Sequence, residues 1–173
     1  MHEIIIAAPE DFPRVRAFYH SIIDEMHHFP WFPCWEKDVY PSGDSLRSCI
    51  SRGEMRLLII DEEIAAAAAL GDELDCTDDV RWPSGAKDVE TASVNMVAAH
   101  PRFARQGLGK QIVSHLMDLA REQGLRSLRL DVVDINEPAK RLYTGLGFQY
   151  VSSSTTVFDD GSSLNFDLYE CIL

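Results

Sequence analysis

The stretch Arg105-Gln-Gly-Leu-Gly-Lys110 decides how the middle of this chain folds. Before it, residues 94–99 are an apolar run that predicts a buried strand ending at His100-Pro101. After it, residues 111–123 carry apolar side chains at helical spacing. A strand that turns through glycines into a helix presents unpaired N–H groups and the positive end of the helix dipole. Because glycine has no Cβ, an anion can approach these N–H groups closely. We therefore expect a phosphate-bearing ligand at this turn.

The composition predicts one ordinary globular domain. The chain has 173 residues and a formal net charge of -12, which argues against binding to nucleic acid or to an anionic membrane and is compatible with a cationic acceptor. No apolar run approaches membrane-spanning length, and the chain enters a strand directly, so we expect no signal peptide and a cytoplasmic protein. The cysteines are scattered without a C-x-x-C spacing, which indicates reduced thiols and neither zinc nor redox motifs. They are Cys34, Cys49, Cys76 and Cys171.

The N-terminal half predicts a strand, two helices and a hairpin. After a strand at residues 3–7, a helix opens at Pro9 and ends near His28, where prolines follow. A second helix runs to Ser51 with Ser42 or Asp44 as its cap. Strands follow at 56–60 and at the alanine run 64–70, where hairpin context outweighs helix propensity. Residues 71–91, with a turn at 82–85, are either a substrate-side flap or a variable insertion.

The loop after the first helix is unusually aromatic. Its large apolar side chains either cover the edge of the core or line a pocket for an apolar or cationic acceptor. The candidates for contact with a substrate are Trp31, Phe32, Trp35 and Tyr40. His27 and His28 are neighbours on a helix and do not face one point, so we expect no metal site.

The C-terminal half continues the alternation of helix and strand. Gly124 ends the helix after the glycine turn, and residues 127–133 predict a strand. Asn136 caps a short helix to about Thr144, followed by strands at 149–152 and from Ser163 onward. Two nucleotide-binding motifs fit the glycine turn poorly, because Ile112 replaces the third glycine of a dinucleotide fingerprint and the Gly-Lys-Ser/Thr ending of a P-loop is absent.

Two segments taken together resemble the GNAT N-acetyltransferase superfamily. They are His100-Pro-Arg-Phe-Ala-Arg-Gln-Gly-Leu-Gly-Lys110 and Asn136-Glu-Pro-Ala-Lys-Arg-Leu-Tyr-Thr-Gly-Leu-Gly-Phe148, in the order and spacing of that family. The resemblance implies an α/β fold of three layers, with a mixed, mostly antiparallel sheet of six to seven strands flanked by about four helices. It implies one domain over 1–173, an acetyl-CoA core at about 93–150, and acceptor-side elements at about 9–52 and 71–91.

The resemblance also implies roles for single residues. The backbones of Val97 and Ala99 would pair with the pantetheine arm of acetyl-CoA. Asn136 would bond the pantetheine or a bridging water, and Tyr143 would return a proton to the leaving thiolate. The amides that would hold the diphosphate belong to Arg105, Gln106, Gly107, Leu108, Gly109 and Lys110. Ala104 departs from the Gln or Arg usual at its position, which implies less electrostatic help, although Arg105 partly substitutes.

Spacing supports the pair Asn136 and Tyr143 independently. They are seven residues apart, two helical turns, and so share a face. A phenol with a pKa near 10 is a suitable acid for a thiolate of comparable basicity. The alternative for Tyr143 is a core aromatic beside Leu142.

Asp131 is the first candidate for the base that takes the proton of the attacking amine. It lies on the strand before Asn136, on the face opposite Leu128 and Leu130. Ribosomal-protein N-terminal acetyltransferases, which this segment resembles, carry a glutamate at a similar position. The alternative is a solvated or structural aspartate, and some family members use no base. Weaker candidates are Glu36, Asp72 and Glu73, while His100 fits a turn.

The sequence thus predicts an enzyme that moves an acetyl group from acetyl-CoA to an amine in a ternary complex, without an acyl-enzyme cysteine or a metal. The expected partner is a small amine such as an amino sugar, polyamine or amino-acid derivative, with a peptide N-terminus as runner-up. A non-catalytic acyl-CoA-binding module is the alternative of another class. The oligomeric state stays open, with a homodimer as one option because family members often dimerise.

Overall fold

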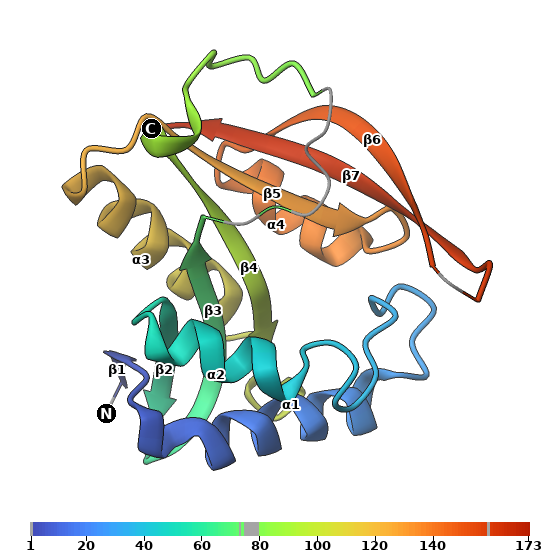
Figure 1. The fold of residues 1–173 in the computed structure, drawn as a ribbon. Helices are drawn as coiled ribbons and strands as arrows, with labels where there is room; N and C mark the ends of the chain where they lie inside the picture. The colour runs from blue at the N-terminus through green and yellow to red at the C-terminus, as the bar shows by residue number, and fades with distance from the viewer. Residues whose placement is uncertain (1, 73, 75–79, 159) are drawn as a thin grey trace.

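A computed structural model describes residues 2–72, 74, 80–158 and 160–173. Its seven-stranded sheet has the order β1-β2-β3-β4-β5-β7-β6, in which only β4 and β5 are parallel (Figure 1). The strands are β1 (His2–Ile6), β2 (Met55–Ile60), β3 (Glu63–Gly71), β4 (Thr91–Ala99), β5 (Ser127–Val133), β6 (Gln149–Val157) and β7 (Ser163–Ile172). The α-helices of the described ranges are α1 (Phe12–Met26), α2 (Gly43–Ser51), α3 (Leu108–Glu122) and α4 (Glu137–Gly145). The predicted fold class is confirmed.

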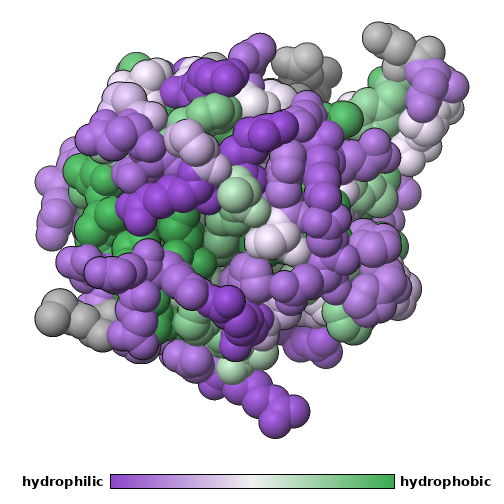
Figure 2. Space-filling view, turned by 90° about the horizontal axis from the view of Figure 1, so that it is seen from below, coloured by the Kyte–Doolittle hydropathy of each residue, from purple (hydrophilic) through white to green (hydrophobic). Residues whose placement is uncertain are grey.

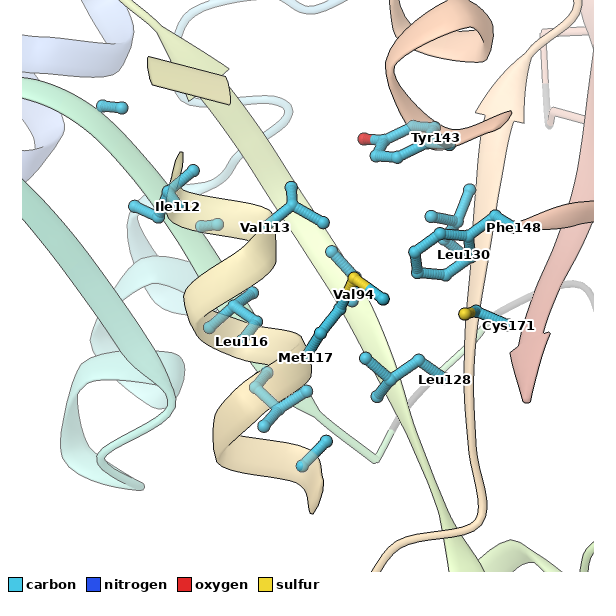
Figure 3. Packing of buried hydrophobic residues seen from close by; sticks show 14 of the residues in the cluster. Val94, Ile112, Val113, Leu116, Met117, Leu128, Leu130, Tyr143, Phe148 and Cys171 are labelled. Atoms are coloured by element: carbon cyan, nitrogen blue, oxygen red, sulfur yellow. The ribbon is translucent and has the colours of Figure 1, made fainter. Parts of the chain in front are cut away.

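Two apolar clusters cover the two faces of the sheet. β2 shows the division, because Leu58 and Ile60 belong to the cluster under α3 and α4, whereas Leu57 and Ile59 belong to the cluster under α1 and α2. Figure 3 shows the first cluster, with Val113 and Met117 of α3 directed toward Val94 of β4 and Leu128 of β5. The molecule therefore has three layers, helix on sheet on helix.

The alanine run forms β3, as predicted. Residues Ala65–Ala69 are fully buried, and β3 pairs with β2 on one side and β4 on the other. A helix here would leave both neighbouring strands without a partner, so tertiary pairing outweighs the helix propensity of alanine. The small side chains let the helices of both layers approach the sheet.

The strands β4 and β5 pair only at their beginnings. The paired residues are Thr91 to Ser93 and Ser127 to Arg129, after which the two strands diverge (Figure 1). A bulge bends β4 where Met96 takes a positive φ of 53°, opposite a register shift in β3. The buried hydroxyl of Tyr19 donates to the carbonyl oxygen of Met96 at 2.7 Å and holds this bulge. The sheet is consequently open between the second halves of β4 and β5.

Some predicted boundaries differ from the structure, and the structure decides one alternative that the sequence left open. α3 begins at Leu108 and not at 111, because the Gly107 carbonyl already accepts the Gln111 N–H at 3.0 Å. β6 extends to Val157 and not only to Ser152, because it pairs with β7 over its whole length. At α2, Ser42 is the cap and Asp44 is not, since the Ser42 Oγ accepts the Ser45 N–H at 3.0 Å.

The described part of the 71–91 segment packs at the beginning of β5. Its predicted turn is present, with the Gly85 N–H donating to the Trp82 carbonyl at 3.1 Å. Ser84 donates to the buried Glu170 carboxylate through its N–H at 2.9 Å and its Oγ at 2.6 Å. The buried Arg129 guanidinium lies 4.5 Å from the Trp82 ring centroid. This anchoring occurs at the beginning of β5, where β4 and β5 are paired.

The surface seen from below is mainly hydrophilic, with smaller apolar areas between (Figure 2). Within the described ranges, every helix is too short or too polar to cross a membrane.

Candidate active site

A cavity of about 280 Å³ lies where β4 and β5 diverge. Five elements contribute to its wall: β4, the end of β5, α4, the aromatic loop after α1, and the β6–β7 hairpin. The lining residues are Val94–Val97 of β4, Asp131–Val133 of β5, Asn136, Ala139 and Tyr143 at α4, Pro33, Cys34, Trp35 and Tyr40 of the loop, and Thr156, Phe158, Leu164 and Phe166 of the hairpin. The structure thus brings the predicted Asn136, Tyr143, Asp131 and Val97 to one place.

Among the described residues, no strand pairs with the cavity-facing edge of β4 beyond Ser93. The His100 N–H donates to Ala65 on β3 at 2.9 Å, and successive residues of a strand point their backbone groups to alternate sides. The backbone groups of Ala99, and of Val97 two residues before it, therefore point toward the gap. Since β4 pairs with β5 only up to Ser93, this stretch can accept an extended ligand as an added strand.

The glycine turn presents an open helix N-terminus next to this edge. Gly107 is the N-cap of α3 with a left-handed φ of 69°, and no side chain caps the helix. The first N–H groups of α3 have no partner within the helix, so they are available to an anion. Glycine is required at positions 107 and 109 for different reasons. Gly107 supplies the positive φ, whereas a Cβ on Gly109 would lie 3.2 Å from Leu142 of α4. Gly109 therefore lets α3 pack closely against α4.

Asn136 and Tyr143 share the cavity side of α4, as their spacing predicts. The Asn136 Oδ1 accepts the Ala139 N–H at 3.2 Å, which caps the helix and fixes the side chain. Tyr143 is 6% exposed and packs edge-on against Phe148 with ring centroids 5.8 Å apart. Its hydroxyl points away from Phe148 and toward β4 (Figure 3). Among the described residues this hydroxyl has no hydrogen-bond partner, and none of their polar side-chain atoms is both buried and unpartnered. The hydroxyl therefore opens to the cavity.

The pKa of Tyr143 is raised above its ordinary value of 10.0. Burial is the largest cause, followed by the negative charge of Asp131 and by Tyr40. The expectation of a pKa near 10 is therefore wrong, because it neglected desolvation. Tyr143 is fully protonated at neutral pH and holds a proton to donate.

Asp131 lies on the predicted face of β5. It pairs with Leu168 of β7, whereas Leu128 and Leu130 point into the opposite core. Its carboxylate is half-buried, lines the cavity and acts electrostatically on Tyr143. Asp131 therefore supplies the one carboxylate among the described residues that line the cavity.

The weaker base candidates lie elsewhere. Glu36 and Asp72 are exposed and do not line the cavity, and Glu73 lies outside the described residues. His100 is a turn residue, as predicted: its Nδ1 accepts the Arg102 N–H at 3.2 Å, and its Nε2 lies 3.1 Å from the Ser21 Oγ.

The aromatic loop both lines the cavity and packs on the core, while its predicted contact with an acceptor stays a prediction. Trp35 and Tyr40 line the cavity. Phe32 instead is buried in the core under α1 and α2, and Trp31 stacks on Phe29 with ring centroids 5.1 Å apart. Phe32 and Trp31 therefore lie away from the cavity wall, because the loop turns Phe32 toward the core and Trp31 toward the outer surface.

Sequence reasoning missed the wall formed by the β6–β7 hairpin. Leu164 and Phe166 alternate with polar residues in the sequence, and this signal identified β7. Their pairing with β6 and β5 was needed to place them beside Asp131. Within the described part of the chain, no group of three or more His, Cys, Asp and Glu side chains could hold a metal ion.

Comparison with known proteins agrees with this geometry. The model of the Acetyltransferase (GNAT) family matches residues 16–148, so the chain belongs to the GNAT acetyltransferase family. The [ribosomal protein bS18]-alanine N-acetyltransferase of Escherichia coli K12 is 37% identical over 60 residues, which are 35% of this chain and 40% of that protein. The streptothricin acetyltransferase of Streptomyces lavendulae is 27% identical over 71 residues, 41% of this chain and 38% of that protein. The chain thus matches about two fifths of the length of each relative.

Solved structures show the same fold over the full length. A GNAT family acetyltransferase from Streptococcus agalactiae has a TM-score of 0.75 and 18% identity, covering 99% of this chain and 95% of that one. The protein yncA from Salmonella typhimurium, solved with acetyl-CoA, has a TM-score of 0.68 and 21% identity, covering 100% and 94%.

Proposed function

We propose that this chain transfers the acetyl group of acetyl-CoA to the primary amine of a small molecule, by direct attack in a ternary complex. One observation carries the proposal: the open edge of β4, the Tyr143 hydroxyl and the Asp131 carboxylate meet in one cavity. Membership of the GNAT acetyltransferase family supports the choice of donor.

The cofactor side provides backbone groups. Val97 and Ala99 would pair with the amides of the pantetheine arm, and the N–H groups from Arg105 to Lys110 would bind the diphosphate. The Asn136 Oδ1 is used to cap α4, so its amide nitrogen is the group that would donate to the arm or to a bridging water. The exposed Arg105 would add the charge that Ala104 does not supply.

The reaction needs two protons removed from the ammonium nitrogen and one proton supplied to the sulfur. Asp131 takes a proton from the ammonium, directly or through water, and the neutral nitrogen attacks the thioester carbonyl carbon. The C–N bond forms and the C–S bond breaks, and Tyr143 donates its proton to the departing sulfur. Tyr143 then regains a proton from solvent, the product nitrogen loses its remaining extra proton to water, and Asp131 releases the proton it took to solvent. Burial keeps Tyr143 protonated until negative charge develops beside it.

Two alternatives have their own supporting observations. A peptide N-terminus as acceptor is favoured by the relative that is named as acting on ribosomal protein bS18. A non-catalytic acyl-CoA-binding module needs only the glycine turn and the β4 edge. The small cavity covered by the aromatic loop and the hairpin favours a small acceptor over a peptide.

The test is an acetyl-transfer assay with purified protein, acetyl-CoA and separate small primary amines and peptides. Release of the CoA thiol and the mass of the product are both measured. The proposal predicts thiol release that requires a small amine and a product heavier by one acetyl group. Binding of acetyl-CoA without transfer to any amine would favour the module, and transfer to peptides alone would favour the N-terminal alternative.

A further inference from the structure

The acceptor end of the cavity is walled by one face of the half-sheet β5-β7-β6. Directly paired residues of antiparallel strands share a face, and Phe166 pairs with both Val133 and Ser154. Leu164 pairs with Thr156 on the same face, two residues along β7. Asp131 lies on this face as well, two residues before Val133. One carboxylate therefore stands at the end of a surface made by Phe166 and Leu164.

The aromatic loop forms another part of the cavity wall, and three neighbouring rings hold its Trp35 in place. Trp35 contacts three rings, with centroid distances of 5.9 Å to Tyr19, 6.0 Å to Phe32 and 5.9 Å to Tyr40. Tyr19 and Phe32 are buried in the core, so the wall is fixed before a ligand arrives. A fixed aromatic wall can bind an apolar group or a cation with little loss of conformational entropy.

The described residues of the cavity wall carry one formal charge, which is negative. Among the described residues that line the cavity, Asp131 alone carries a formal charge, and no lysine or arginine is present. An ammonium group can pair with this carboxylate. A second ammonium or a carboxylate on the same ligand would lie against Phe166, Leu164 or Trp35, where burial of an unpaired charge is unfavourable.

We propose, building on the acetyl transfer above, that the acceptor is an apolar, preferably aromatic, primary amine with one positive charge and no carboxylate. Its ammonium pairs with Asp131, and its apolar part lies between Trp35 and Phe166. After the proton leaves to Asp131, the nitrogen takes the acetyl group, and the products are an N-substituted acetamide and the CoA thiol. Amino acids, polyamines and amino sugars are poor acceptors on this account.

Matched pairs of amines test the charge rule. 2-Phenylethylamine and phenylalanine differ by one carboxylate, and pentylamine and 1,5-diaminopentane differ by one ammonium. The expected kcat/KM is at least about tenfold higher for the first member of each pair, because an unpaired charge in an apolar pocket is penalised. Glucosamine represents the amino sugars. A preference for phenylalanine, 1,5-diaminopentane or glucosamine would overturn the inference and leave acetyl transfer intact.

Variants test the wall. Trp35→Ala and Phe166→Ala should each raise the KM for 2-phenylethylamine about tenfold, with the dissociation constant of acetyl-CoA unchanged. Trp31→Ala is the matched control, because this tryptophan of the same loop lies outside the cavity wall, and its KM should stay at the wild-type value. Equal effects of Trp31→Ala and Trp35→Ala would contradict the assignment.

A binding measurement separates this inference from the proposed function. Calorimetric titration of the protein–CoA complex with 2-phenylethylamine should show binding that phenylalanine does not show. Such binding without transfer to any amine would overturn the acetyl-transfer proposal alone. If 2-phenylethylamine is neither bound nor acetylated, the inference is overturned.

Discussion

The two sides of the cavity differ in the groups they offer a ligand. The side proposed to bind acetyl-CoA, the cofactor side, consists of main-chain groups: the open edge of β4 and the first N–H groups of α3. The acceptor side consists of side chains from two segments far apart in the sequence, the 33–40 loop and the β6–β7 hairpin. Main-chain groups are the same in any sequence that keeps the fold, whereas an aromatic wall changes with each substitution. On the proposed function, the cofactor side therefore defines the class of reaction, and the acceptor side defines the substrate.

The largest effect is expected at Tyr143, which lies where the two sides meet. Tyr143→Phe removes the proton donor but keeps the ring against Phe148. The turnover number should fall about 100-fold or more, as for the loss of a general acid, while the affinity for acetyl-CoA stays unchanged. Steady-state kinetics and calorimetry measure the two quantities. Tyr169→Phe is the control, because this buried tyrosine of β7 lies outside the cavity wall and its loss should leave turnover unchanged.

Asp131 should give the next largest effect. Asp131→Asn keeps the shape of the side chain but removes the base and the pairing charge, so kcat/KM for the amine should fall about tenfold or more. Acetyl-CoA affinity should not change. Asp134→Asn serves as control, because Asp134 accepts from Asn165 at 3.3 Å and does not line the cavity. Equal losses in both variants would assign Asp131 a structural role.

The cofactor side alone can be weakened at Gly107. Gly107 and Gly124 flank α3 with positive φ values of 69° and 74°, and neither has an atom within 4 Å of a built Cβ. Alanine at either position should destabilise the fold by about 1 kcal/mol through backbone strain. Only Gly107→Ala should raise the dissociation constant of acetyl-CoA, by about five- to tenfold, because it alters the turn that presents the N–H groups. A similar rise for Gly124→Ala would show that the effect is general instability.

The smallest effect on turnover is expected at Glu170, which lies outside both sides of the cavity. Burial acts to raise the pKa of Glu170, but hydrogen bonds from Ser84, Ser127 and Arg129 outweigh it, and the pKa lies below its ordinary value of 4.5. A lowered folded-state pKa stabilises the protein above the unfolded pKa, and this stability is lost as the pH falls through the folded value.

Glu170→Gln should therefore lower the free energy of unfolding by about 1–3 kcal/mol at pH 7 and leave the kinetics unchanged. The difference from wild type should shrink below pH 4.5. Denaturant unfolding of both proteins at pH 7 and below pH 4.5 measures this difference in the free energy of unfolding. A difference that persists or grows in acid would contradict the assigned role of the carboxylate.

The structural parts of the proposed cofactor side could be predicted from the sequence because they are local. The glycine turn, the Asn136 cap and the spacing to Tyr143 all lie within single elements, where spacing alone fixes which residues share a face. The strand assignment of the alanine run also succeeded, since the hairpin context was visible.

The acceptor side could not be predicted in the same way. Trp31 and Trp35 are tryptophans of the same loop, and the sequence does not distinguish them. Only the folded loop shows that Trp35 turns toward the cavity. Phe166 and Leu164 reach Asp131 through the register of three strands, which the sequence does not specify. The raised pKa of Tyr143 likewise depends on burial, which spacing does not report.

A crystal structure of the protein with bound CoA tests the central claim most directly. The account predicts the pantetheine arm along β4 beside Val97 and Ala99, the diphosphate at the N–H groups of Arg105 to Lys110, and the thiol sulfur within hydrogen-bonding distance of the Tyr143 hydroxyl. An arm bound away from the gap between β4 and β5, or a sulfur remote from Tyr143, would contradict it.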